Sequence, residues 1–313
     1  MSFTSDTCNA IDLFFNAVLG NHDTAFGIRI SIAFCVGIIL VSFVTSTITG
    51  NYSQVDKAWS IVPALYAWFV VRDERTLLMA VLATIWGIRL TWNFNRRGGY
   101  SWPPWTGDED YRWKYLQDGF FIPWLKNPVL WVVFNLVFIS FYQHLLLWLI
   151  ASPSVVASLV SSSCGHVPLN MMDFIATIIF LSAILIESIA DNQQYEFQTE
   201  KHRRRKEGLE LQGEYKDGFK QSGLFGIVRK PNYAAEQFVW ITFYTFSIAA
   251  TKGYQLWNWS GIGFILLCLL FQGSGWFTEN ITISKYPKYK EYQKITPLYV
   301  PNPFQLFGKP KAE

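Results

Sequence analysis

Seven apolar runs, separated by charged or turn-forming segments, dominate the sequence. A membrane-spanning helix needs about 20 predominantly apolar residues, and the longest runs reach that length. Two runs depart from the simple pattern, because the second is short and the third carries Arg89. The pattern predicts helices in the interval between Arg29 and Asp56 and in 58–71, 77–94, 129–151, 174–195, 234–251 and 257–277.

The composition agrees with a membrane protein. Hydrophobic residues make up 51% of the 313 residues, aromatic residues 18% and charged residues 16%, whereas a soluble domain usually carries about 25% charged residues. A bilayer and its interfaces can accommodate this many aromatic rings. The composition excludes a disordered chain, a collagen-like chain and an ordinary soluble globule. We therefore expect an all-α polytopic membrane protein with about seven transmembrane helices, forming a single integral membrane domain over residues 1–313.

The basic residues are distributed unevenly between the two sets of alternating loops. One set carries 21 Lys and Arg residues and the other carries 4, with Arg89 inside a run. Loops rich in Lys and Arg remain in the cytosol. This asymmetry predicts a lumenal N-terminus and a cytosolic C-terminus. The N-terminal segment lacks a basic region before its first apolar run, so we expect a retained anchor rather than a cleaved signal peptide.

Several kinds of partner and site are excluded by simple counts. A net charge of +3 is too small to indicate nucleic acid binding. The sequence contains neither a metal-ligand spacing nor a GxGxxG dinucleotide motif. The cysteines are widely spaced, so we expect small buried apolar residues rather than a disulfide framework or a zinc site. They are Cys8, Cys35, Cys164 and Cys268.

Two segments carry polar residues where an apolar helix would be expected. Glu187 and Asp191 are four residues apart near the end of one run, so they share a helix face. In GLFGIVRKPNYAAEQFVW (223–240), a proline is well placed to begin a helix, and a helix N-terminus beside basic side chains can hold an anion. This stretch suggests a site for a nucleotide with phosphate, ribose and amide groups. Its candidate residues are Arg229, Lys230, Asn232, Tyr233 and Glu236.

The stretch GLFGIVRKPNYAAE resembles the signature of the steroid 5α-reductase C-terminal superfamily, in its branch of multi-span membrane proteins. Similar segments are VDKAWSIVP, RLTWNFNRRGGY, EDYRW and FTENITISKYPKYKEYQKITPLYVP. The resemblance extends over about residues 30–305, with the reductase-like C-terminal region at about 125–305. It implies the helical bundle of steroid reductases and isoprenylcysteine methyltransferases. Ala235 stands where the signature usually has glycine.

The resemblance also implies a cofactor and the residues that bind it. Asn232 and Glu236 match positions that line the NADPH site of steroid 5α-reductases. Asp191 and Glu187 match a cofactor-contacting pair on the preceding helix, although Glu187 replaces an asparagine. Polar and aromatic residues near the C-terminus are implied to close the site. The candidates are Glu279, Asn280, Tyr286 and Tyr289.

The expected reaction is NADPH-dependent reduction of a conjugated carbon–carbon double bond in a lipid such as a sterol, a polyprenol or an enoyl lipid. An acid must assist the hydride transfer, and Asp56 and Tyr66 are the nearest acidic and phenolic candidates in the early helices. The resemblance implies the endoplasmic reticulum membrane, and lipid as the partner. Two alternatives remain: an S-adenosylmethionine-dependent lipid or isoprenylcysteine methyltransferase, and a non-enzymatic lipid-binding protein.

Overall fold

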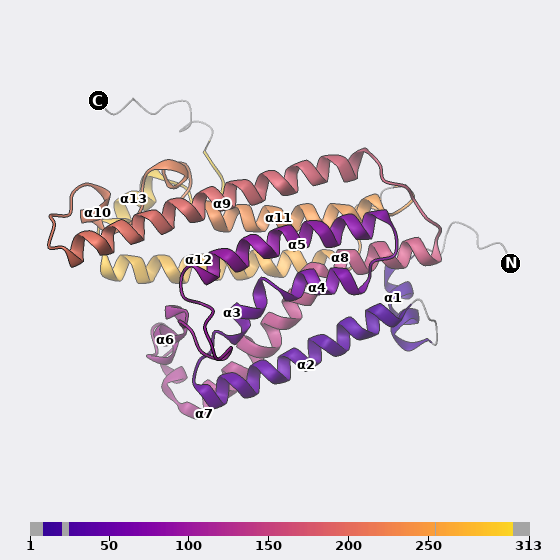
Figure 1. The fold of residues 1–313 in the computed structure, drawn as a ribbon, viewed down its shortest axis with the longest axis horizontal. Coiled ribbons are helices and arrows are strands. Elements are labelled where there is room, and N and C mark those ends of the chain that lie inside the picture. Colours follow the sequence, from indigo (N-terminus) through magenta and orange to yellow (C-terminus); the bar gives the residue numbers. More distant parts are fainter. Residues whose placement is uncertain (1–8, 21–24, 254, 303–313) are drawn as a thin grey trace. The chain divides into compact units, whose positions relative to one another are not determined.

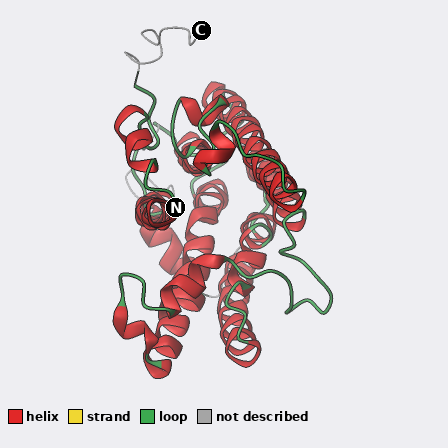
Figure 2. Ribbon diagram, turned by 90° about the vertical axis from the view of Figure 1, so that its left-hand side faces the viewer, coloured by secondary structure: helices red, strands yellow, loops and turns green. Residues whose placement is uncertain are grey.

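The computed structural model describes residues 9–20, 25–253 and 255–302, and this part of the chain consists of helices and loops without strands (Figure 2). Two compact units divide the chain. Unit 1 comprises Met1–Ile178 and Trp240–Leu267, and unit 2 comprises Ile179–Val239 and Cys268–Glu313. Three long helices, α9, α11 and α12, contribute residues to both units. A single integral membrane domain over residues 1–313 stays a prediction.

Unit 1 holds the helices from the first described residues to α8 (Figure 1). They are α1 (Ala10–Leu19), α2 (Phe26–Thr49), α3 (Gln54–Trp59), α4 (Val62–Phe69), α5 (Glu74–Asn95), α6 (Tyr111–Gln117), the 3-10 helix η2 (Pro123–Lys126), α7 (Pro128–Phe134), the π-helix η3 (Asn135–Tyr142) and α8 (Gln143–Ser163). The contacts among α2, α4, α5 and α8 form the centre of this unit.

Unit 2 takes most of α9 and the chain that follows it, apart from the later part of α11 and the beginning of α12. Its helices are α9 (Met171–Lys206), α10 (Glu214–Asp217), the 3-10 helix η4 (Gly223–Gly226), α11 (Pro231–Ala249), α12 (Gly261–Lys285) and α13 (Tyr289–Ile295). An aromatic cluster of Phe219, Tyr289 and Tyr292 packs the loop after α10 against α13.

Five helices of the described chain are long and apolar enough to cross a membrane: α2, α5, the continuous helix Pro128–Ser163, α9 and α12. They confirm an all-α polytopic membrane architecture, and the protein is an integral membrane protein. The other two expected runs take different forms. Residues 58–71 hold the end of α3 and all of α4, and residues 234–251 lie mostly in the 19-residue α11. The total of about seven spans stays a prediction.

The expected loop at 152–173 is wrong in its first half. The helix that begins at Pro128 continues to Ser163, with Pro153 inside it. Residues 152–160 are all buried, and Val156 and Val160 pack against Ala10 of α1. This packing of an apolar face keeps the segment helical beyond the expected end of the span.

Two glycines allow close approaches to the break between α3 and α4 and to the end of α4. A Cβ atom on Gly87 of α5 would lie 2.5 Å from the Ser60 carbonyl oxygen, and one on Gly27 of α2 would lie 1.9 Å from the Phe69 carbonyl oxygen. Real Cβ atoms do not approach backbone oxygens this closely, because protein interiors are packed at hard-contact distances. Glycine at both positions therefore sets how closely α2 and α5 pack against this part of the chain.

The expectation that no cysteine forms a disulfide is wrong for Cys164 and correct for Cys35 and Cys268. Cys164, at the end of α8, is disulfide-bonded. Cys35 is a free and buried thiol, and Cys268 is free and partly buried. Cys8 lies outside the described residues. Wide spacing in sequence concealed the disulfide because cysteines distant in sequence can meet once helices pack.

Candidate functional site

A hydrogen bond in unit 2 joins the two polar segments singled out in the sequence. Asn232, in the first turn of α11, donates from Nδ2 to Oδ1 of Asp191 on α9 at 3.1 Å. The two residues are 41 positions apart, so this pairing exists only because α9 and α11 meet here. A carboxylate at the first turn of a helix also interacts favourably with the positive end of the helix dipole. The protein's own Asp191 thus supplies a negative group where the sequence suggested an external anion.

Two further carboxyl groups are buried on the same two helices. Glu187 lies four residues before Asp191 on α9, and Glu236 lies four residues after Asn232 on α11. Each glutamate is only 4% exposed. Residues four apart on a helix share a face, so each glutamate extends the polar face of its helix. Burying a carboxyl group costs free energy that polar partners must offset, so both positions need a polar environment.

The turn before α11 is held firmly against α9. Gln193 accepts a hydrogen bond at Oε1 from the backbone N–H of Leu224, at 3.0 Å. Gly223 has a φ of +65°, and a Cβ atom there would lie 2.5 Å from the Gln193 side-chain oxygen. Only glycine adopts this conformation readily. Gln193, two positions from Asp191, therefore fixes the approach of the chain to the first turn of α11.

Arg229, a predicted cofactor-binding residue, lies in an ion pair. Its Nε and Nη2 atoms donate to the two carboxylate oxygens of Glu279 on α12, at 2.6 and 3.1 Å. Its Nη1 atom donates to the backbone carbonyls of Gln293 and Thr296. Every nitrogen of the guanidinium thus has a protein partner. This geometry supports a structural role, whereas direct binding of cofactor by Arg229 stays a prediction.

Glu279 is the centre of a larger network that ties α12 to α13. It accepts hydrogen bonds from the Tyr289 hydroxyl at 2.9 Å and from Nε2 of Gln293 at 2.8 Å. Burial and the neighbouring Glu279 charge raise the pKa of the Tyr289 phenol above its ordinary value. The phenol is therefore a neutral donor at physiological pH. Glu279 and Tyr289, which the resemblance suggested as residues closing the cofactor site, bond to each other in the structure.

The backbone beside Arg229 is also fixed. The N–H groups of Arg229 and Lys230 donate to the carbonyls of Pro297 and Leu298, at 2.8 and 3.1 Å. The Lys230 ammonium donates to Thr278 and lies 5.3 Å from the centre of the Tyr233 ring. The Tyr233 ring in turn packs edge-on against Phe271 at 4.8 Å. Both Tyr233 and Lys230 are therefore engaged with α12 beside the first turn of α11.

The predicted acids Asp56 and Tyr66 both belong to unit 1 but lie on different short helices. Asp56 is on α3 and Tyr66 is on α4. The chain between them breaks at Ser60 and Ile61, and α4 begins with Pro63 in its first turn. A continuous helix would turn two residues ten apart onto different faces, whereas the break lets the directions of Asp56 and Tyr66 be set independently.

Asp56 is partly buried and accepts a hydrogen bond at Oδ2 from the Trp113 indole, at 3.1 Å. Burial, followed by the negative charge of Asp110, raises the pKa of the Asp56 carboxyl above its ordinary value. Arg112 acts in the opposite direction but does not cancel this rise. A raised pKa increases the fraction of the carboxyl that remains protonated, which a proton donor requires.

Tyr66 is 1% exposed, and its ring packs edge-on against Phe34 of α2 at 5.9 Å. Its hydroxyl lies beside the Cys35 thiol of α2, which is its hydrogen-bonding neighbour. The ring therefore serves packing within unit 1, and the hydroxyl is directed at α2.

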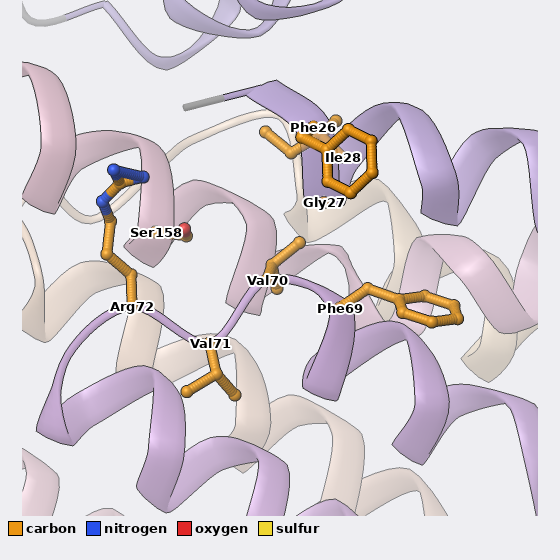
Figure 3. Close-up of a pocket in the computed structure, with 8 residues that line it drawn as sticks. All are labelled: Phe26, Gly27, Ile28, Phe69, Val70, Val71, Arg72 and Ser158. Atoms are coloured by element: carbon orange, nitrogen blue, oxygen red, sulfur yellow. The ribbon is translucent and has the colours of Figure 1, made fainter. Parts of the chain in front are cut away.

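A small cavity of about 210 Å³ lies elsewhere in unit 1 (Figure 3). It is lined by the beginning of α2, the last residue of α4 with the chain that follows it, and one residue of α8. In Figure 3 the Phe69 and Arg72 side chains point away from each other at its edge. None of the predicted site residues lines it. The lining residues are Phe26, Gly27, Ile28, Phe69, Val70, Val71, Arg72 and Ser158.

Sequence reasoning missed Gln193 and Gln293. Both are ordinary polar residues at helix positions, and although Gln293 lies within the segment 277–301 quoted for the resemblance, neither residue was assigned a role there. The signal for Gln193 was its position on the helix of Glu187 and Asp191, two residues beyond the latter. Nothing in the local sequence near Gln293 indicates that it bonds Glu279.

Comparison with known proteins gives a family without an assigned activity. Residues 42–296 match the family described as "Protein of unknown function (DUF1295)". An uncharacterized protein of Schizosaccharomyces pombe is 32% identical over 281 residues, which cover 83% of this chain and 77% of that protein. No solved structure matches the chain.

Proposed function

The chain belongs to the DUF1295 family, and on that premise we propose that it is a membrane-embedded, NADPH-dependent reductase of a conjugated carbon–carbon double bond in a lipid. The proposal places the family in the steroid 5α-reductase superfamily. One observation supports it above the others. The Asn232–Asp191 hydrogen bond unites the two segments that the resemblance assigns to one cofactor site.

The donors and acceptors in unit 2 fit the nicotinamide and ribose groups of NADPH better than they fit its phosphate groups. The amide of Asn232 and the carboxyls of Asp191, Glu187 and Glu236 suit a carboxamide and ribose hydroxyl groups, which both donate and accept hydrogen bonds. Phosphate is a poorer match at the first turn of α11, because Asp191 lies there and Arg229 is occupied by Glu279. Asn232, Asp191 and Glu236 would therefore hold the nicotinamide riboside portion.

NADPH supplies a hydride when bound, and reduction of an alkene conjugated to a carbonyl requires one proton in addition. Hydride addition at the β-carbon leaves an enolate, and protonation at the α-carbon completes the saturated product. Asp56, with its raised pKa, and Tyr66, with its hydroxyl, are the proposed sources of that proton. Their roles are separate from cofactor binding in this proposal.

Titration of the purified protein in lipid nanodiscs with NADPH and with S-adenosylmethionine tests the proposal. We expect saturable binding of NADPH, no competition by S-adenosylmethionine, and oxidation of NADPH when an enone lipid is added. Binding of S-adenosylmethionine alone would identify a methyltransferase instead. Binding of neither compound, with lipid retained by the protein, would favour a non-enzymatic lipid-binding protein.

A further inference from the structure

The segment formed by residues 96–127 connects two membrane-spanning helices of unit 1. It follows the end of α5 at Asn95 and precedes the helix that begins at Pro128. Both helices are long and apolar enough to cross a bilayer, so the segment leaves and re-enters the membrane on one side. Figure 1 shows it, with α6, at the end of unit 1 where α2 also ends. The 96–127 segment is thus confined to one membrane surface by its two ends.

The segment is folded and fixed to the neighbouring chain. The Lys57 ammonium donates to the carbonyls of Pro104 and Thr106, at 3.2 and 2.5 Å. The Asn51 side chain donates to the carbonyl of Gly107 at 3.0 Å. Burial of Lys57 lowers the pKa of its ammonium. A buried lysine that bonds two carbonyls fixes the loop to α3.

An apolar cluster joins the segment to its neighbours in unit 1. Trp113 and Leu125 are buried against Val55, Trp131 and Ile139. The segment therefore buries one set of large apolar residues against α3 and the helix that begins at Pro128.

Five aromatic side chains of the segment face outward, with exposed fractions of about one half or more. Exposing large apolar side chains to water costs free energy, so five of them on one fixed segment favour an apolar or interfacial environment. Phe121 adopts a φ of +67°, which is rare for a bulky residue. The exposed fractions of the five aromatic side chains are 87% for Trp102, 50% for Trp105, 51% for Tyr111, 49% for Phe121 and 56% for Trp124.

The charges of the segment are mixed rather than of one sign. Five basic and four acidic residues give a formal charge of +1, and Arg112 pairs with Asp110 at 2.9 Å. This balance does not favour nucleic acid or a strongly acidic protein. Aromatic rings interspersed with both charge signs are typical of the headgroup layer of a bilayer, where Trp and Tyr are enriched. The charged residues are Arg96, Arg97, Arg112, Lys114, Lys126, Asp108, Glu109, Asp110 and Asp118.

We propose that the 96–127 segment is an interfacial anchor, whose exposed aromatic side chains lie in the phospholipid headgroup layer on the side of the membrane where α5 ends. The proposal concerns the bilayer itself as the partner and does not depend on the reductase activity. Because Lys57 and Trp113 attach the segment to α3, its position in the headgroup layer would also set how deeply unit 1 lies in the bilayer.

Site-directed fluorescence in proteoliposomes tests this placement. Trp102→Cys and Trp124→Cys, each in a Cys35→Ala/Cys268→Ala background, are labelled with bimane without reduction. The background protein corrects for labelling elsewhere. Val41→Cys on the exposed face of α2 provides the buried-in-lipid reference. Glu210→Cys, in the exposed loop after α9, provides the aqueous reference.

We expect the probes at Trp102 and Trp124 to be quenched more by lipids carrying a nitroxide on the headgroup than by lipids carrying it near the chain end. The Val41 probe should show the opposite order, and iodide should quench the Glu210 probe most. Iodide quenching of the Trp102 and Trp124 probes equal to that at Glu210, without lipid quenching, would overturn the proposal. Shielding from iodide without lipid quenching would also overturn it, since a protein surface would then cover the segment.

Discussion

The Arg229–Glu279 pair shows how a single contact can change the role assigned to a residue. The sequence placed Arg229 beside the presumed cofactor because of its position before Pro231. In the structure its guanidinium bonds Glu279, which is 50 residues away. No local pattern relates the two positions, so sequence could not distinguish a ligand-binding arginine from a paired one.

Removing one partner of this pair should destabilise the protein strongly. Arg229→Met leaves the Glu279 carboxylate buried without its cation, and breaking a buried pair costs about 3–5 kcal/mol. Arg229→Met/Glu279→Leu should recover part of that loss, because neither charge then remains uncompensated. Reversible unfolding in mixed detergent micelles measures both variants. If Arg229→Met leaves stability unchanged but abolishes NADPH binding, the arginine is a cofactor ligand after all.

Asp56 should act through its protonated form. Folding raises its pKa above the unfolded value of about 3.9, so the folded state favours the neutral carboxyl. Its contribution to stability is greatest below the unfolded pKa and declines as pH rises through the raised folded pKa. Asp56→Asn should therefore flatten the dependence of unfolding on pH in this range.

The same variant tests the proposed chemistry. Asp56→Asn should lower turnover of an enone lipid and leave NADPH affinity nearly unchanged, with Asp108→Asn, an exposed residue of the neighbouring loop, as the control. Turnover equal to that of the parent would remove Asp56 from the mechanism. Loss of NADPH binding would instead assign it to the cofactor site.

At the scale of the helices, the pattern of apolar positions predicted the long spans well and the short ones poorly. Runs of more than 20 apolar residues became α2, α9 and the helix beginning at Pro128. Residues 58–71 became parts of two short helices. The Ser60 carbonyl at the break packs beside Gly87 of α5, a tertiary contact that periodicity cannot reveal.

The start of α11 at Pro231 was predicted from its proline, but the attachment of the preceding turn to α9 was not. Gly223→Ala should weaken NADPH binding, because the new Cβ atom must displace Gln193 and so shift Leu224 and the first turn of α11. Gly208→Ala is a matched control, since Gly208 has a φ of +68° and open space around it. Both variants carry the backbone strain of a non-glycine residue at positive φ, about 1 kcal/mol.

Equal NADPH affinity in Gly223→Ala and Gly208→Ala, at similar thermal stability, would contradict a role for the Gln193 contact in shaping the site. A selective loss in Gly223→Ala would support it. Isothermal binding measurements on both purified variants provide the comparison.

At the scale of the whole molecule, the chain orientation is a prediction from its basic residues. The disulfide at Cys164 agrees with it, because disulfides persist in oxidising compartments and the segment after α8 is expected to be lumenal. A tag placed after Glu313 should be removed by protease added to intact microsomes. Full protection of that tag, together with cleavage of a tag inserted after Gly165, would reverse the orientation.

The central claim is that Asn232 and Glu236, with Asp191, form a cofactor site in unit 2. The most direct measurement is the NADPH affinity of Asn232→Ala and Glu236→Gln in nanodiscs. The matched controls are Asn192→Ala and Glu196→Gln, at exposed positions of α9. Each site variant removes a buried or partly buried polar partner worth about 1–3 kcal/mol, so we expect roughly 5- to 150-fold weaker binding with thermal stability close to that of the controls. Parental NADPH affinity in both Asn232→Ala and Glu236→Gln would contradict the account.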